Sequence, residues 1–272
     1  MTSSYILIFI FGTIIGSFLN VVLYRMHTGK SLNGRSHCMS CRKELEWYEL
    51  FPVFSYLSQR GKCRGCLSYI PSRYLFVELA TGLLYCITFF FFHANIFLLL
   101  LFAVLNTLFM LVVVYDIRHT IIPDELSLMI GGVAVIYLGY VLSLTLDWML
   151  VGKHILAGLS AGLFFWGLWF VSKGRWIGLG DAKLALPLGM IVGLGSVFSM
   201  VVLSFWIGAV ISVSLLGLER VLKRGKIHLH FMGTPLTIKS EVPFAPFMIL
   251  GFLLVQLLHA DIFNITYVLF FS

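Results

Sequence analysis

The chain has 272 residues, of which 60% are hydrophobic and 11% are charged, and its formal net charge is +7. A soluble domain carries about a quarter charged residues, so this composition excludes an ordinary soluble protein and indicates a polytopic membrane protein. In such a protein the positive charge is a topology signal and an attraction to anionic lipid, and it does not indicate binding to nucleic acid.

Apolar segments recur along the whole chain, and most are close to the roughly 20 residues that a membrane-spanning helix needs. The first could be read as a signal peptide, but residues 1–4 hold no basic side chain and no small-residue cleavage site follows, so we expect a true span. The sequence therefore predicts an all-α polytopic membrane protein with about eight transmembrane helices. The expected spans are approximately residues 4–24, 74–92, 96–115, 126–146, 153–172, 183–195, 197–218 and 243–259.

Lysine and arginine gather in the loops between alternate spans. Eighteen of the nineteen lie within or at the edge of loops 25–73, 116–125, 173–182 and 219–242, and only Lys153 lies elsewhere. Because cytoplasmic loops carry an excess of Lys and Arg, we expect these loops in the cytoplasm and the N-terminus outside.

The loop 26–73 carries two C-x-x-C pairs separated by twenty-one residues, a spacing that is typical of a four-thiolate zinc site. The candidate ligands are Cys38, Cys41, Cys63 and Cys66. Two disulfides or four idle thiols are the alternatives, and a cytosolic loop disfavours the disulfides. Four cysteines leave no open position on zinc, so we expect a structural metal that staples a small cytoplasmic loop domain between the first two spans. Cys86 lies within the second span and is interpreted as a packing residue.

Three aspartates, Asp116, Asp124 and Asp181, are predicted at the cytoplasmic border of the membrane. Two neighbouring carboxylates share one proton, so one can activate water while the other polarises a peptide carbonyl. We expect the glycines beside Asp181 to let a substrate backbone approach. The alternative is that these acids cap helices or form ion pairs, and Asp124, which follows Pro123, fits a first-turn position.

Other charged residues have simpler interpretations. Lys183 either favours ionisation of Asp181 or extends to the membrane interface. Three acids in the cysteine loop, Glu44, Glu46 and Glu49, are expected to be solvated.

Five segments follow one another in a fixed order along the chain. They are GSFLNVV at 16–22, the paired C-x-x-C loop, Asp116 followed by IPD at 122–124, GLGDAK at 178–183, and VPFAPF at 242–247. This series resembles the type IV prepilin peptidase family, the GxGD-type aspartic proteases of bacterial pilus, type II secretion and competence systems. The resemblance covers nearly the whole chain.

The resemblance implies that Asp116 and Asp181 are the catalytic pair and that Asp124 lies near them outside the pair. It implies zinc at the four cysteines, an N-terminal region at 1–92 and a peptidase domain at 96–272. It also implies a location in the bacterial cytoplasmic (inner) membrane, with prepilins or pseudopilins as substrates and no nucleic acid. Many members also N-methylate the new N-terminus with S-adenosylmethionine.

Two further polar residues in apolar surroundings, Asn20 and Glu78, have three open interpretations: methyl transfer, binding of the substrate amine, or a tie between helices. We favour the tie. For the whole chain, the alternatives to a peptidase are a proton- or ion-coupled transporter and an inactive scaffold of a secretion assembly. The key acids gather at one face and no internal repeat is visible, which disfavours the transporter.

Overall fold

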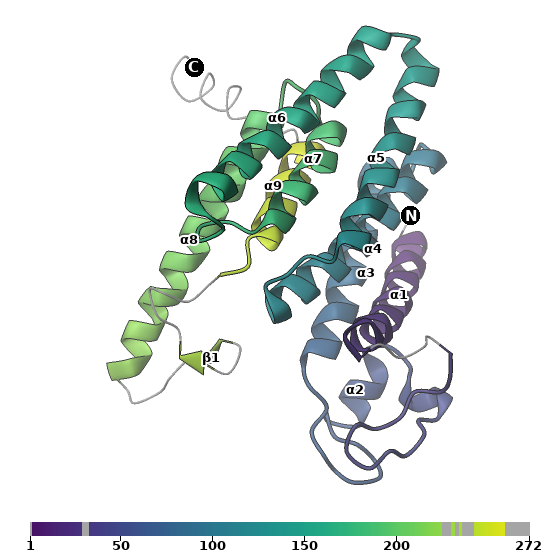
Figure 1. The fold of residues 1–272 in the computed structure, drawn as a ribbon. Helices are drawn as coiled ribbons and strands as arrows, with labels where there is room; N and C mark the ends of the chain where they lie inside the picture. Colours follow the sequence, from purple (N-terminus) through teal and green to yellow (C-terminus); the bar gives the residue numbers. More distant parts are fainter. Residues whose placement is uncertain (1, 29–32, 225–229, 232–233, 236–241, 259–272) are drawn as a thin grey trace. The chain divides into compact units, whose positions relative to one another are not determined.

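The computed structural model describes residues 2–28, 33–224, 230–231, 234–235 and 242–258 (Figure 1). The prediction of an all-α membrane protein is confirmed, since all long elements in this part of the chain are helices. The helices are α1 (Thr2–Thr28), α2 (Phe54–Ser58), α3 (Arg73–Phe92), α4 (Ile96–His119), α5 (Asp124–Thr145), α6 (Trp148–Ser172), α7 (Leu179–Val192), α8 (Val197–Arg224) and α9 (Ala245–Leu258), with a 3-10 turn η1 at Trp47–Glu49. The strands β1 (His230–Phe231) and β2 (Thr234–Pro235) pair antiparallel.

The number of spanning helices differs from the prediction. Within the described residues, six helices are long and apolar enough to cross a membrane, namely α1, α3, α4, α5, α6 and α8. The other two predicted spans form α7 and α9, each with 14 described residues. Fourteen residues extend about 21 Å at 1.5 Å per residue, which is less than the roughly 30 Å of the hydrocarbon core. Gly193, with φ of +83°, ends α7 in a left-handed conformation that glycine adopts without strain.

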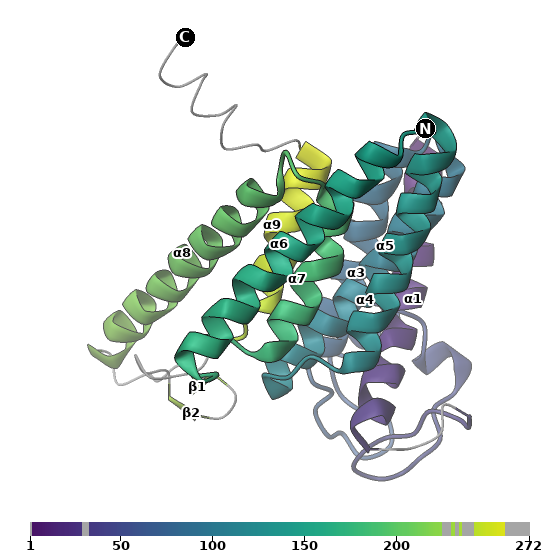
Figure 2. The same ribbon diagram turned by 45° about the horizontal axis from the view of Figure 1, so that its top comes forward.

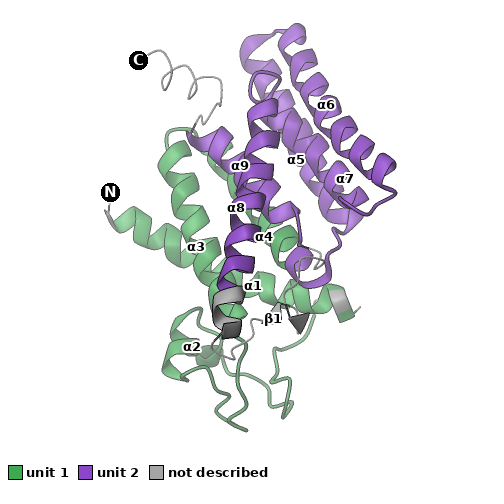
Figure 3. Ribbon diagram, turned by 90° about the vertical axis from the view of Figure 1, so that its left-hand side faces the viewer, with its two compact units in different colours: residues 1–114 green, residues 115–272 purple. Residues whose placement is uncertain are grey.

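The chain forms two compact units, residues 1–114 and 115–272 (Figure 3). In unit 1, α1 lies directly against α3, because a Cβ added at Gly16 would lie 2.8 Å from the Glu78 Cα. Polar contacts join α3 to α4: the Asn106 amide donates to the Thr88 hydroxyl at 2.7 Å. The loop between α1 and α3 carries the cysteines.

Unit 2 is built on the close pairing of α6 with α7 and of α8 with α9 (Figures 1 and 2). A Cβ added at Gly189 of α7 would lie 2.8 Å from the Ala157 carbonyl oxygen of α6, and one at Gly251 of α9 would lie 2.9 Å from the Met200 carbonyl oxygen of α8. Small residues at such contacts let helix backbones approach in a membrane, where dispersion contacts rather than water drive packing.

We expect Gly189→Ala to destabilise the protein by about 1–3 kcal/mol, because the new methyl group must push α6 and α7 apart. Gly167→Ala is the matched control, since Gly167 lies in α6 with no atom within 4 Å of the added Cβ. This control should leave stability unchanged or raise it slightly. Thermal unfolding of the purified proteins in detergent measures both changes, and equal midpoints for the two variants would contradict the packing described here.

Candidate active site and metal site

Asp181 lies in the first turn of α7, two residues after the helix begins. Its side chain is buried, with 7% of the residue exposed, and its Oδ2 accepts a hydrogen bond from the Gly178 backbone N–H at 3.1 Å. Backbone N–H groups at a helix start have no partner within the helix, so a carboxylate is well placed to accept from them. The helix start therefore fixes the orientation of Asp181.

Asp116 lies near the C-terminal end of α4 and is also buried, with 4% exposed. Its Oδ2 accepts a hydrogen bond at 3.1 Å from the backbone N–H of Ala245, the first residue of α9. This N–H is one of the groups that a helix start leaves without an internal partner. The contact joins residues 129 positions apart, so α9 holds Asp116 in place.

The structure brings Asp116 and Asp181 close enough for their charges to interact. The connection from α4 to α5 lies on the first turn of α7, since a Cβ added at Gly180 would lie 3.0 Å from the Ile122 Cβ. Gly180 therefore makes room for Ile122 of the same chain, where the sequence predicted room for a substrate backbone. Two buried carboxylates whose charges interact cannot both ionise readily, so the pair suits general acid–base chemistry.

Asp124 and Lys183 form an ion pair with each other, with Nζ and Oδ1 2.6 Å apart. Asp124 is the first residue of α5, the first-turn position that the sequence predicts. Their side chains are 72% and 43% exposed, in contrast to the two buried aspartates. Neither sequence interpretation of Lys183 anticipated this partner.

An aromatic cluster surrounds the start of α9. Phe244, the residue before Ala245, has its ring centroid 5.6 Å from that of Phe165 in α6 and 5.0 Å from that of Phe205 in α8. The cluster is apolar, so it fixes the backbone that donates to Asp116 without offering a competing acceptor. The sequence marked this segment, VPFAPF at 242–247, only as one of the five that carry the family resemblance.

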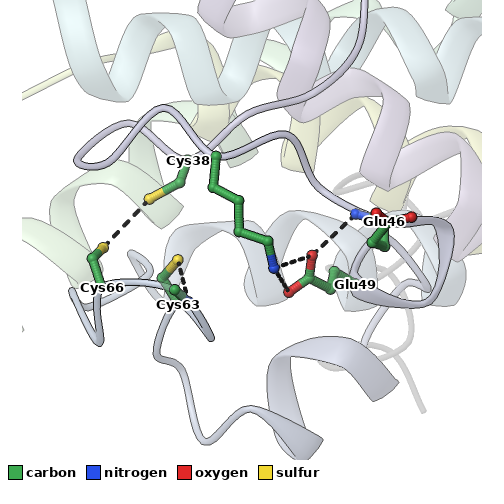
Figure 4. Close-up of polar contacts among 7 residues, drawn as sticks. Cys38, Glu46, Glu49, Cys63 and Cys66 are labelled. Atoms are coloured by element: carbon green, nitrogen blue, oxygen red, sulfur yellow. Dashed lines mark hydrogen bonds and ion pairs between the residues drawn. The ribbon is translucent and has the colours of Figure 1, made fainter.

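In unit 1 the four predicted metal ligands cluster, with all Sγ atoms within 4.8 Å of one another. The Sγ atoms of Cys38 and Cys66 lie 3.8 Å apart, and Figure 4 shows these two sulfurs facing each other with Cys63 beside them. All four cysteines are free thiols, so the disulfide alternative is not what the structure shows. The cluster is suited to hold a metal ion.

The two C-x-x-C pairs have the same local fold, a tight turn that directs two sulfurs to one side. In the first, the Ser40 N–H donates to the Cys38 Sγ at 3.4 Å; in the second, the Gly65 N–H donates to the Cys63 Sγ at 3.4 Å. The residue after each pair has φ of +59°. Backbone N–H groups, that of Cys41 first, lower the pKa of the Cys38 thiol to about 6, which favours the thiolate that binds metals.

Glu49 departs from the prediction that the acids of this loop are solvated. Its side chain is 1% exposed and pairs with the Lys43 ammonium at 3.3 Å (Figure 4). Its Oε2 also accepts the Glu46 N–H at 3.0 Å, the contact that contributes most to lowering the pKa of this carboxyl. The Glu49 carboxylate therefore lies in the interior of the loop, while the Lys43 side chain that pairs with it is 41% exposed.

Asn20 and Glu78 act partly as ties, the interpretation that the sequence favoured. The Asn20 amide donates to the Tyr74 carbonyl at 3.2 Å and so joins α1 to α3. Glu78 in α3 accepts the Val53 N–H of the loop at 2.8 Å and a hydrogen bond from the Ser17 side chain of α1.

Sequence reasoning identified the aspartates and cysteines but missed the backbone groups of Gly178 and Ala245. A backbone N–H is present at nearly every residue, so no residue type marks the one that will meet a carboxylate. The nearest signal was the helix start implied by the glycines and prolines of these two segments.

Comparison with known proteins covers both units. Residues 10–92 match the bacterial peptidase A24 N-terminal domain, and residues 103–213 match the type IV leader peptidase family. The first match includes the four cysteines, and the second includes both buried aspartates. No solved structure matches the chain.

Several relatives carry the name prepilin leader peptidase/N-methyltransferase. One from Pseudomonas aeruginosa is 30% identical over 95% of this chain and 91% of its own length. One from Myxococcus xanthus is 32% identical over 78% of this chain and 63% of its own length, and one from Stutzerimonas stutzeri is 29% identical over 88% and 85%. This chain is thus a multi-pass membrane protein that belongs to the type IV leader peptidase family, among the prepilin leader peptidase/N-methyltransferases.

Proposed function

We propose that this chain is an aspartic endopeptidase that removes the leader of prepilins or pseudopilins, with Asp116 and Asp181 as its catalytic pair. The observation that carries the proposal is the pair itself: two buried carboxylates, close enough for their charges to interact, each held by a backbone N–H. The names of the relatives supply the substrate class.

The proposed reaction is hydrolysis of one peptide bond. The ionised carboxylate takes a proton from water as the water oxygen attacks the carbonyl carbon, and the protonated carboxyl donates a hydrogen bond to the carbonyl oxygen. The C–N bond then breaks and the leaving amine takes up a proton. Because an N–H already binds the Oδ2 of each aspartate, each Oδ1 is left for water or substrate.

The setting of this reaction follows from the charge pattern and the family. The Lys and Arg distribution supports an inner-membrane protein with the N-terminus outside and the loops that carry the aspartates and cysteines in the cytoplasm. We assign residues 1–92 to an N-terminal region and 96–272 to the peptidase domain. We further propose that the chain N-methylates the new N-terminus with S-adenosylmethionine. The relatives are named N-methyltransferases as well as prepilin leader peptidases.

The four cysteines fit structural zinc. Zinc in a tetrahedral site with Zn–S bonds of about 2.3 Å places its sulfurs about 3.8 Å apart, and the Cys38 and Cys66 sulfurs are 3.8 Å apart. Four thiolates would close the coordination shell, so the metal would hold the loop and take no part in hydrolysis.

We expect Asp116→Asn and Asp181→Asn each to lower the rate of prepilin leader cleavage by about 100-fold or more, because asparagine can neither take up nor release the proton. The measurement is cleavage of a prepilin in membranes or detergent, with expression and zinc content as checks on folding.

Asp124→Asn is the matched control for this experiment. It makes the same chemical change at an exposed position, and loss of an exposed ion pair costs about 1 kcal/mol or less, so cleavage should stay within a few-fold of wild type. Near wild-type cleavage by either buried-site variant would show that the pair is misassigned. A wild-type chain that cuts no prepilin would overturn the peptidase proposal.

We expect the purified protein to contain one zinc ion per chain and Cys63→Ser to lose it, because a serine hydroxyl is not ionised at neutral pH. Cys86→Ser is the control, since Cys86 lies in α3, outside the cluster. Metal analysis and protease sensitivity of the loop measure both effects. Full zinc content in Cys63→Ser would show that the four cysteines are not the zinc site.

A further inference from the structure

Unit 1 contains a pocket with a volume of about 500 Å³, formed by α1, the start of α3 and the cysteine loop. Ligand pockets in proteins range over roughly 300–1,000 Å³ and combine aromatic walls with a few polar groups. The α1 side of the pocket is one helix face, made by Ser17, Asn20, Val21, Tyr24 and Arg25. The volume and composition are those of a site for a small organic molecule.

Glu78 provides the only acidic side chain that the α1 and α3 walls contribute to this pocket. The residue is 8% exposed, and its two hydrogen-bond donors, the Val53 N–H and the Ser17 side chain, are neutral. No lysine or arginine in the described part of the chain forms an ion pair with it. A carboxylate accepts about four hydrogen bonds, so Glu78 has capacity left for a cation in the pocket.

Aromatic rings make up much of the remaining wall. Tyr24, Tyr56 and Tyr74 line the pocket and are half-buried, so their positions are fixed while part of each ring faces the space. Tyrosine faces stack on planar heterocycles and attract cations through the ring quadrupole. The pocket therefore combines several rings with charged groups of both signs. Glu49, Arg25, Arg35 and His37 also line it. Glu49 pairs with Lys43, Arg35 pairs with Glu44 and Arg25 donates to loop carbonyls, so among the described residues Glu78 is the buried carboxylate in this wall that has no cationic partner.

We propose that this pocket binds S-adenosylmethionine, with the Glu78 carboxylate facing the ammonium group of the molecule and the tyrosines against its adenine ring and sulfonium group. The proposal rests on the methyltransferase activity proposed above and assigns it a place in the chain. The amine of a mature pilin is also a cation, but an amine alone would not require a pocket of this volume or these rings.

S-adenosylmethionine supplies a methyl group: the amine nitrogen forms a bond to the methyl carbon, the carbon–sulfur bond breaks with its electron pair left on sulfur, and the amine releases a proton. The chain's own residues bind and orient. Asn20 is held by the Tyr74 carbonyl and keeps α1 and α3 in register on two sides of the pocket. The Arg25 guanidinium donates to the Asn33 and Gly34 carbonyls at 3.0 and 3.2 Å and so fixes the loop wall.

The cysteine turns form part of the same wall, since Cys38, Cys63 and Ser68 line the pocket. A metal bound to the cysteines would therefore hold the wall in shape. The metal site then gains a role in methyl-donor binding that peptide hydrolysis does not need.

The test is equilibrium binding of radiolabelled S-adenosylmethionine to the purified, zinc-loaded full chain in detergent. We expect Glu78→Gln, which keeps the shape but removes the charge, to raise the dissociation constant at least tenfold. Tyr56→Leu should also weaken binding. It provides a second measurement of the pocket's contribution if Glu78→Gln loses zinc. Leader cleavage by both variants should stay within twofold of wild type, which shows that the chain is folded.

The control is Glu46→Gln, the same chemical change on an exposed loop residue whose side chain forms no ion pair among the described residues and does not line the pocket. Its affinity should equal that of wild type. If wild type binds and both pocket variants bind equally well, the pocket assignment is wrong and the methyltransferase proposal stands. If wild type cleaves prepilin but binds no S-adenosylmethionine, both are overturned while the peptidase proposal stands.

Discussion

Backbone N–H groups at the starts of two short helices hold both aspartates of the candidate active site. Gly178, just before α7, donates to Asp181, and Ala245, the first residue of α9, donates to Asp116. A helix start is one of the few places where a membrane protein has free N–H groups, because the helix interior uses all of its own. Both short helices therefore begin where a buried carboxylate requires a donor.

This arrangement depends on how closely the backbones approach elsewhere in unit 2. Gly180 leaves room for Ile122, so the α4–α5 connection can lie on the first turn of α7. Gly189 in turn lets α7 lie against α6. A side chain at either glycine would shift the start of α7, and with it Asp181, relative to Asp116. A misplacement of about 1 Å is enough to cost two orders of magnitude in rate. These glycines therefore affect the rate of the reaction because they set the position of Asp181.

The sequence predicted the features that are local and missed those that depend on how segments far apart in sequence pack together. The long helices follow from hydropathy, although among the described residues six of the eight expected spans reach spanning length. The cysteine cluster follows from spacing, and both features are properties of a short stretch of chain. The contact of Ala245 with Asp116 joins positions 129 residues apart, and no pattern marks it. The pairing of Lys183 with Asp124, 59 positions apart, was missed for the same reason. The burial of Glu49 was also missed, although its partners Lys43 and Glu46 lie close to it in sequence.

The burial of the Glu78 carboxylate in unit 1 costs free energy that the fold alone does not explain. Burying a carboxylate with only neutral donors is unfavourable, and an apolar residue at position 78 would pack between α1 and α3 without that penalty. The tie to Val53 accounts for one hydrogen bond and leaves the charge uncompensated. The same carboxylate lies on the wall of a pocket that also holds Arg25 and Arg35. Arg25 donates to loop carbonyls and Arg35 pairs with Glu44, so under the proposal above a cationic ligand compensates the charge of Glu78. The unfavourable burial then becomes favourable in the complex, and the pocket gains selectivity for a positively charged molecule over a neutral one of the same shape.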